Sequence, residues 1–131
     1  MLNIFHKSNF FERNIYERVT DKKLENIKEL TLMKISIKLY KRGEELLIGA
    51  CDEELLGKRF KEGELRLHVK KSFYDGHRID EKVLVAYLKE ATIANLVGKR
   101  TVECAIKYGY VNPECVLVIG GVPHAQIVKM L

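Results

Sequence analysis

The sequence predicts an α+β fold, with a mixed, mainly antiparallel sheet and two main helices packed on one face. Segments that alternate apolar and polar residues come first, two segments with apolar residues at helical spacing follow, and two apolar segments of strand length close the chain. This order of strands, helices and strands favours helices on one face of a mixed sheet. At 131 residues, the chain is long enough for one compact core and too short for two ordinary domains.

The first 32 residues differ in pattern from the rest. Between residues 9 and 32, Phe11, Ile15 and Val19 recur at helical spacing with charged residues between them, which predicts a loose amphipathic helix. From Met33 the pattern changes abruptly to period two. We therefore predict a single domain over residues 33–131, and at residues 1–32 either a loosely attached extension or a mis-called start.

Strands are predicted in the first half of this domain. The stretch "KISIKLY" (34–40) alternates like a half-buried strand, and a glycine turn joins it to "ELLIGAC" (45–51), which is apolar on both faces like a central strand. Asp52 then follows in a position to cap a short helical turn. The stretch "GELRLHV" (63–69) alternates again and is predicted to join the same sheet.

Helices and closing strands are predicted in the second half. Asp80 is in position to cap a helix over about residues 81–91, and a second helix is expected from Lys99 to Tyr108. Between them, "TIANLVG" (92–98) is ambiguous. The stretches "CVLVIG" (115–120) and "HAQIVKML" (124–131) have the composition of strands.

The glycines of "IGGVPHAQ" (119–126) resemble a phosphate-binding loop. Such a loop leads directly into a helix N-terminus, whereas Pro123 biases Val122 toward extended geometry. Gly120 and Gly121 therefore predict a bend or bulge between two strands. His124 has no carboxylate or second histidine in a local motif, which favours a structural histidine over a general base.

The composition of the chain bears on its cellular location and on whether it holds a metal or a cofactor. No apolar run reaches the roughly 18 residues of a membrane span, and the N-terminus lacks the order of a secretory signal, so we expect a cytoplasmic protein with no membrane partner. The cysteines Cys51, Cys104 and Cys115 are odd in number and far apart, which excludes both a disulfide framework and a paired zinc motif. We predict no metal and no cofactor.

Basic residues form the most coherent pattern. The chain has 23 Lys and Arg against 18 Asp and Glu, a net charge of +5 that attracts polyanions at long range. If the alternating strands share one sheet, its open face carries a positive stripe that includes an aromatic ring, a surface suited to RNA. The alternative is that a lysine-rich face only keeps the protein soluble. The residues of the predicted stripe and of one adjoining turn are Lys34, Lys38, Tyr40, Lys41, Arg42, Arg66, His68 and Lys70. Lys58 and Arg59 are expected in a second adjoining turn.

An enzyme is the competing hypothesis. A cysteine beside a helix N-terminus can be a nucleophile, and a Cys51/His124 dyad would form if the two segments met in space. This hypothesis places Cys51, Asp52, Asn95 and His124 around one pocket. Burial at the end of an apolar strand is the interpretation we favour for Cys51.

Four stretches together carry a family resemblance: "CDEELLGKRFKEGELRLHV" (51–69), "SFYDG" (72–76), "ATIANLVGKR" (91–100) and "IGGVPHAQIVKML" (119–131). In this order they make the sequence from Met33 onward resemble DUF424, a family of small archaeal proteins of unknown function. The resemblance implies an α+β domain in an archaeal cytoplasm. It brings no established activity and no catalytic residues, and residues 1–32 depart from it.

Three functions therefore remain open. The first is a non-enzymatic module that binds RNA or a ribonucleoprotein in translation. The second is a small enzyme with a pocket lined by Cys, His and Asn. The third is a protein-interaction or homodimerisation module that uses an edge strand.

Overall fold

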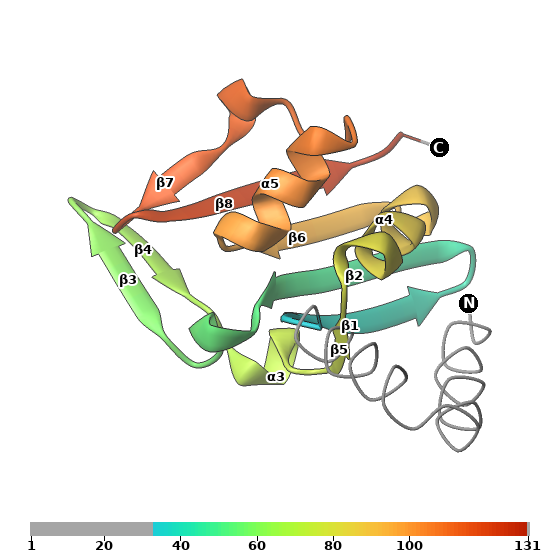
Figure 1. The fold of residues 1–131 in the computed structure, drawn as a ribbon, viewed down its shortest axis with the longest axis horizontal. Helices are drawn as coiled ribbons and strands as arrows, with labels where there is room; N and C mark the ends of the chain where they lie inside the picture. The colour runs from blue at the N-terminus through green and yellow to red at the C-terminus, as the bar shows by residue number, and fades with distance from the viewer. Residues whose placement is uncertain (1–32, 131) are drawn as a thin grey trace, which may run out of the picture.

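The computed structural model describes residues 33–130, and its main feature is a six-stranded sheet in the order β5-β1-β2-β6-β8-β7 (Figure 1). The strands are β1 (Ile35–Arg42), β2 (Glu45–Asp52), β5 (His77–Ile79), β6 (Ile93–Val97), β7 (Leu117–Ile119) and β8 (Val122–Val128). All neighbouring strands are antiparallel except β2 and β6, which are parallel. The prediction of an α+β fold with a mixed, mainly antiparallel sheet is confirmed. Residues 1–32, and with them the expected helix, lie outside the described part.

Two helices, α4 (Glu81–Glu90) and α5 (Lys99–Lys107), cover one face of this sheet (Figure 1). The helix near residues 81–91 begins as predicted, because the Asp80 carboxylate accepts a 2.9 Å hydrogen bond from the Val83 amide. Apolar side chains of β1, β2 and β6 meet both helices in the larger core cluster. Its fully buried members include Ile35, Ile37, Ile48, Leu84, Leu88 and Leu96. No helix within residues 33–130 has the length and apolar character needed to cross a membrane.

The opposite face of the sheet is only partly covered. The short helix α3 (Lys71–Tyr74) packs on β1 and β2, and a separate two-stranded sheet of β3 (Arg59–Glu62) and β4 (Leu65–His68) packs near β7. We call residues 59–68 the ribbon. It projects at one end of the molecule, on the left of Figure 1. A second, smaller core cluster lies under these elements: Cys51, Leu67, Val69, Tyr74, Val97, Ile119 and Val122.

The prediction that residues 63–69 join the same sheet as the first two strands is wrong. This segment forms β4, which pairs with β3 and not with any strand of the main sheet. The reason is the intervening segment 59–62, whose single apolar residue, Phe60, is too weak a signal for a strand. Once that segment becomes a strand, a turn at Gly63 with φ of 60° closes a local hairpin.

Asp52 stabilises a helix other than the one predicted. It makes no side-chain cap on the short 3₁₀ turn η1 (Glu53–Leu55). Its carboxylate instead accepts hydrogen bonds from the amides of Arg100 (3.0 Å) and Thr101 (2.8 Å) at the start of α5. A Cβ at Gly98, which has φ of 105°, would lie 2.4 Å from the Asp52 Cγ. The start of α5 therefore needs both the distant carboxylate and the glycine.

The turn between β7 and β8 confirms the prediction for "IGGVPHAQ". Gly120 and Gly121 have φ of 57° and 80°, and Ile119 pairs directly with Val122. Positive φ at both central residues is the mark of a type I′ hairpin. The turn also meets the ribbon, since the Gly120 amide donates a 3.1 Å hydrogen bond to the Glu62 carboxylate.

Candidate nucleic-acid interface

The two faces of the ribbon differ in chemistry. Residues of neighbouring antiparallel strands that pair directly point to the same face, and Arg59 pairs with His68 while Lys61 pairs with Arg66. Phe60 and Leu67 form the alternate pair; Leu67 belongs to the second core cluster and Phe60 packs against it. The ribbon therefore buries one face and presents a basic one. We call Arg59, Lys61, Arg66 and His68 the cationic face.

These side chains surround a small hollow. A cavity of about 270 Å³ is lined by the four residues of the cationic face together with Phe60 and Leu67. This volume lies just below the range of roughly 300–1,000 Å³ that is typical of small-molecule sites. A hollow of this size with basic walls fits a phosphate group of a larger ligand better than a complete small molecule.

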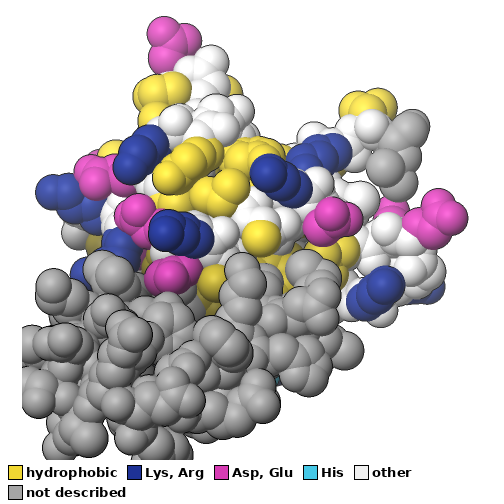
Figure 2. All heavy atoms as spheres, turned by 45° about the vertical axis from the view of Figure 1, so that its right-hand side comes forward, with side chains coloured by type: hydrophobic (Ala, Val, Ile, Leu, Met, Phe, Trp, Pro, Cys, Tyr) yellow, Lys and Arg dark blue, Asp and Glu magenta, His cyan; other side chains and the backbone are white. Residues whose placement is uncertain are grey.

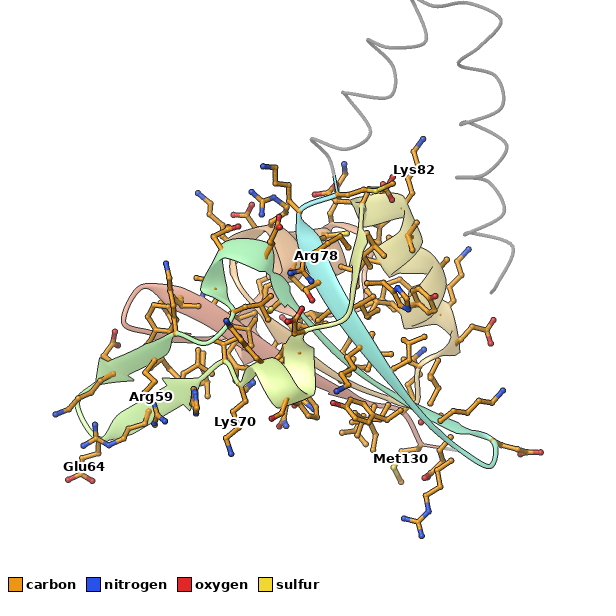
Figure 3. The ribbon with its side chains drawn as sticks, turned by 90° about the horizontal axis from the view of Figure 1, so that it is seen from below. Arg59, Glu64, Lys70, Arg78, Lys82 and Met130 are labelled. Atoms are coloured by element: carbon orange, nitrogen blue, oxygen red, sulfur yellow. The ribbon has the colours of Figure 1, made fainter. Side chains whose placement is uncertain are left out.

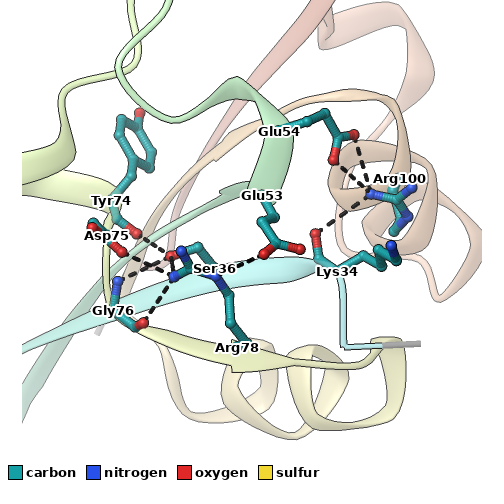
Figure 4. A network of polar contacts seen from close by, with 9 residues as sticks. All are labelled: Lys34, Ser36, Glu53, Glu54, Tyr74, Asp75, Gly76, Arg78 and Arg100. Atoms are coloured by element: carbon teal, nitrogen blue, oxygen red, sulfur yellow. Dashed lines mark hydrogen bonds and ion pairs between the residues drawn. The ribbon is translucent and has the colours of Figure 1, made fainter. Parts of the chain in front are cut away.

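The arginines and lysine of the cationic face have no ion-pair partner among the described residues. Within residues 33–130, Arg59, Lys61 and Arg66 form no ion pair and no side-chain hydrogen bond, and all three are exposed. Two other arginines, Arg78 and Arg100, form ion pairs with carboxylates (Figure 4). Arg78 contacts Asp75 at 2.9 Å, and Arg100 contacts Glu54 at 3.3 Å.

The electrostatic environment of His68 reports the positive potential of this face. Its pKa is lowered from the ordinary value of 6.5 by partial loss of hydration and by the positive charges of Arg59 and Lys70. At neutral pH the imidazole is therefore neutral. A bound phosphate would reverse this effect, because a negative charge stabilises the imidazolium.

Lys38 and Tyr40, predicted on the open stripe, are held by α3. The Lys38 ammonium donates a 2.8 Å hydrogen bond to the Ser72 carbonyl. The Tyr40 hydroxyl donates to the Phe73 carbonyl at 2.9 Å, and the two rings stack with their centroids 5.2 Å apart. The Tyr40 ring is therefore already occupied by a stacking partner.

The other basic residues of the predicted stripe lie in separate parts of the molecule. Lys41 and Arg42 lie at the β1–β2 turn, at the end of the molecule away from the ribbon (Figure 1). Figure 2 brings that end forward and shows Lys and Arg scattered among acidic and apolar side chains. Lys34 lies just before β1, where its carbonyl accepts from the Glu53 amide at 2.8 Å. Only Lys70 follows the ribbon directly, and Figure 3 shows it pointing to the same side as Arg59.

The prediction of one continuous cationic stripe across a single sheet is therefore wrong. Of the predicted residues, Arg66, His68 and Lys70 are grouped. The structure adds to their face Arg59, which the sequence analysis placed in an adjoining turn, and Lys61, which it missed. A signal for them exists in "RFKEGELRLH" (59–68), where basic residues alternate on both sides of Gly63. Recognising it requires the assumption of a hairpin at that glycine.

The cysteine of the enzyme hypothesis is buried and unreactive. Cys51 pairs with Val97 on β6, and Val97 pairs with His124 on β8, so a buried valine lies between the proposed dyad partners. Two strand spacings separate their backbones by about 10 Å. Burial, with a smaller contribution from Asp52, raises the Cys51 pKa to about 12. The thiolate is therefore scarcely present at neutral pH.

The other two residues of that hypothesis do not complete a pocket. Asp52 points to the opposite face of the sheet, toward α5, where it caps the helix. Asn95 lies on the same face as Cys51 and accepts a 2.7 Å hydrogen bond from Gln126. Burial lowers the pKa of His124. Among residues 33–130, no group of His, Cys, Asp and Glu has the arrangement of a metal site.

Comparisons with known proteins give a family and a fold. The family described as "Protein of unknown function (DUF424)" matches residues 40–130. A crystal structure of an uncharacterized conserved protein from Methanopyrus kandleri is 25% identical, with a TM-score of 0.59. That similarity covers 74% of this chain and 94% of the other. No curated protein matches the chain.

Proposed function

Because the chain belongs to the DUF424 family, whose function is unknown, we propose from the geometry of the ribbon that it is a small RNA-binding module. The cationic face contacts the phosphates of RNA. The observation that carries this proposal is the cluster of unneutralised cations around one phosphate-sized hollow. Guanidinium groups bind phosphate oxygens with two parallel hydrogen bonds, and the lysine adds a compact charge.

The spacing of the cations supports contact with a phosphate backbone. Residues two apart on one strand are separated by about 7 Å, and paired residues on the two strands by about 5 Å. Arg59 and Lys61 on one strand and Arg66 and His68 on the other therefore form two parallel rows, in which three side chains are charged at neutral pH and His68 is neutral until it is protonated. The net charge of +5 adds long-range attraction to a polyanion. We place the protein in the cytoplasm, with an RNA or ribonucleoprotein of translation as its partner.

A charge-reversal experiment tests the proposal. The full chain and the Arg59→Glu/Arg66→Glu variant are titrated against a fluorescently labelled RNA hairpin at several salt concentrations. The matched control is Lys82→Glu, an exposed cation on α4 that lies away from the ribbon (Figure 3). We expect RNA affinity to fall steeply with salt, to be lost in the ribbon variant and to be retained in the control. Undetectable binding by the unaltered chain, or binding that salt does not weaken, contradicts the proposal.

A second candidate function is association between two copies of the chain. Strand β7 is an edge of the main sheet, and its Leu117 and Val118 side chains are 52% and 51% exposed. An edge strand with exposed apolar side chains can pair with the same strand of a second copy. Light scattering tests this directly: a dimer that Val118→Lys converts to a monomer supports the hypothesis, and a monomeric unaltered chain contradicts it.

A further inference from the structure

We infer that the RNA recognised by the cationic face is a double helix, contacted along its phosphate backbones, and not an unpaired strand. This inference rests on the proposed RNA-binding function and specifies its ligand. It depends on three features of the ribbon: the position of nearby aromatic rings, the fixed arrangement of the charges and the acidic tip.

The aromatic rings near the ribbon are turned away from the cationic face. Proteins that bind unpaired strands combine positive charge with rings on which successive bases stack. Phe60 is the one Phe, Tyr or Trp within the ribbon, and it packs against the second core cluster on the opposite face, so the imidazole of His68 is the one ring of the ribbon on the cationic face. Of the nearest rings in α3, Phe73 stacks on Tyr40, while Tyr74 is buried and contacts Phe73 edge to face at 4.8 Å. The cationic face therefore offers unpaired bases no Phe, Tyr or Trp ring for stacking.

The charges of the cationic face are carried on a backbone that is fixed to the body. The Val69 amide donates to the Lys58 carbonyl at 2.9 Å, and the Gly57 amide donates to the Val69 carbonyl at 2.7 Å, which keeps the two strands paired as far as the body. Leu67 in the second core cluster and Phe60 packed against it hold the ribbon to the body. Near its tip, Glu62 holds the Gly120 amide. A double helix also presents phosphates at fixed positions, whereas a flexible strand must first be ordered against the protein, at an entropic cost.

The acidic tip determines how the ribbon meets the helix. Glu64 lies at the far end of the ribbon, pointing away from the body (Figure 3). A carboxylate at this position is repelled by phosphates, so the tip does not enter a groove end-on. The deep, narrow major groove of A-form RNA is closed to side chains, while its minor groove is wide, shallow and flanked by phosphates. The cationic face is therefore expected to lie flat across the minor groove.

The test titrates the full chain against three labelled ligands of equal strand length. They are an RNA duplex, one strand of that duplex whose sequence forms no structure by itself, and a DNA duplex. We expect duplex RNA to bind about tenfold more tightly than the single strand, with a salt slope near 0.9 per neutralised phosphate. We also expect weaker binding of duplex DNA, because its minor groove is narrower than that of A-form RNA. Arg59→Glu/Arg66→Glu should remove the preference for duplex RNA, and Lys82→Glu should retain it.

The outcomes separate this inference from the proposed function. Equal or tighter binding of the single strand overturns the inference and leaves RNA binding intact. Equal binding of duplex DNA overturns the assignment to RNA. Failure to bind any of the three overturns both proposals. Circular dichroism of each variant establishes that a loss of binding is not a loss of fold.

Discussion

Two arginines of the main body, Arg78 and Arg100, differ in environment from the two arginines of the ribbon. Arg78 donates to Ser36, Asp75 and the Gly76 carbonyl, and Arg100 contacts Glu54 and the Lys34 carbonyl (Figure 4). Arg59 and Arg66 have no such partner within the described residues. The contacts of Arg78 and Arg100 join segments of one chain, whereas Arg59 and Arg66 keep all their side-chain donors for another molecule. Substitutions in the body should therefore affect stability, and substitutions in the ribbon should affect binding.

The largest effect is expected in the body, at Gly98. Gly98→Ala forces a side chain into a backbone conformation with φ of 105° and against the Asp52 carboxylate. We expect a loss of about 3 kcal/mol or more in the free energy of unfolding. Chemical denaturation measures it. The control is Gly109→Ala, which has φ of 81° but no atom within 4 Å of the added Cβ, and a similar loss there would contradict the role of Asp52.

The second-largest effect is expected in the ribbon, on RNA affinity. Arg59→Glu/Arg66→Glu should lower RNA affinity by about a hundredfold at low salt and reduce the salt slope by about 2, because two phosphate contacts are lost. The free energy of unfolding should change by less than about 0.5 kcal/mol, since both side chains are exposed and form no ion pair with residues 33–130. Binding isotherms and denaturation of the same preparations check both values. A large loss of stability would show that the ribbon arginines also stabilise the fold, which contradicts the division between body and ribbon.

A smaller effect is expected when a body arginine is removed. Arg78→Ala leaves Asp75 and Glu53 without their partner, but the side chain of Arg78 is 36% exposed and solvent screens these charges. Ser36 keeps its hydrogen bonds to the Tyr74 carbonyl and the Gly76 amide. We expect a loss of about 1 kcal/mol in stability and unchanged RNA affinity. Weakened RNA binding by the folded variant would contradict the division between body and ribbon.

The smallest effect is the pH dependence of binding through His68. Its pKa in the free protein is lowered, and a bound phosphate favours the charged imidazolium, so the complex binds more protons than the free protein. RNA affinity should therefore rise by about threefold as the pH falls below 6.5. Titrations between neutral and mildly acidic pH measure this rise. His68→Gln should flatten it, and an unchanged profile in that variant would exclude His68 from the interface.

Strong local patterns in the sequence correctly predicted much of the fold. The alternation of residues 34–40, the apolar run of residues 45–51 and the Asp80 cap each correspond to a structural element. The paired glycines at 120 and 121 correctly predicted a turn between strands. These features depend on neighbours a few residues apart, so they can be recognised without knowledge of the rest of the chain.

The candidate site could be predicted only in part. Arg66 and His68 were recognised as outward residues of a strand, but assigned to the wrong sheet. Arg59 was assigned to a turn and Lys61 was missed, because a strand of four residues with one apolar side chain has no clear period. Tyr40 was expected to be free for stacking, and a ring 33 residues further along the chain occupies it.

Local sequence was therefore sufficient for the alternation that turns basic side chains outward and for the glycines that turn the chain. Tertiary structure alone decided which basic residues become neighbours and which are neutralised. The physical reason is that strand pairing and ion pairs join residues distant in sequence, as with Asp52 and Thr101 across 49 positions. Periodicity predicts the direction of a side chain, but not the element that it will meet.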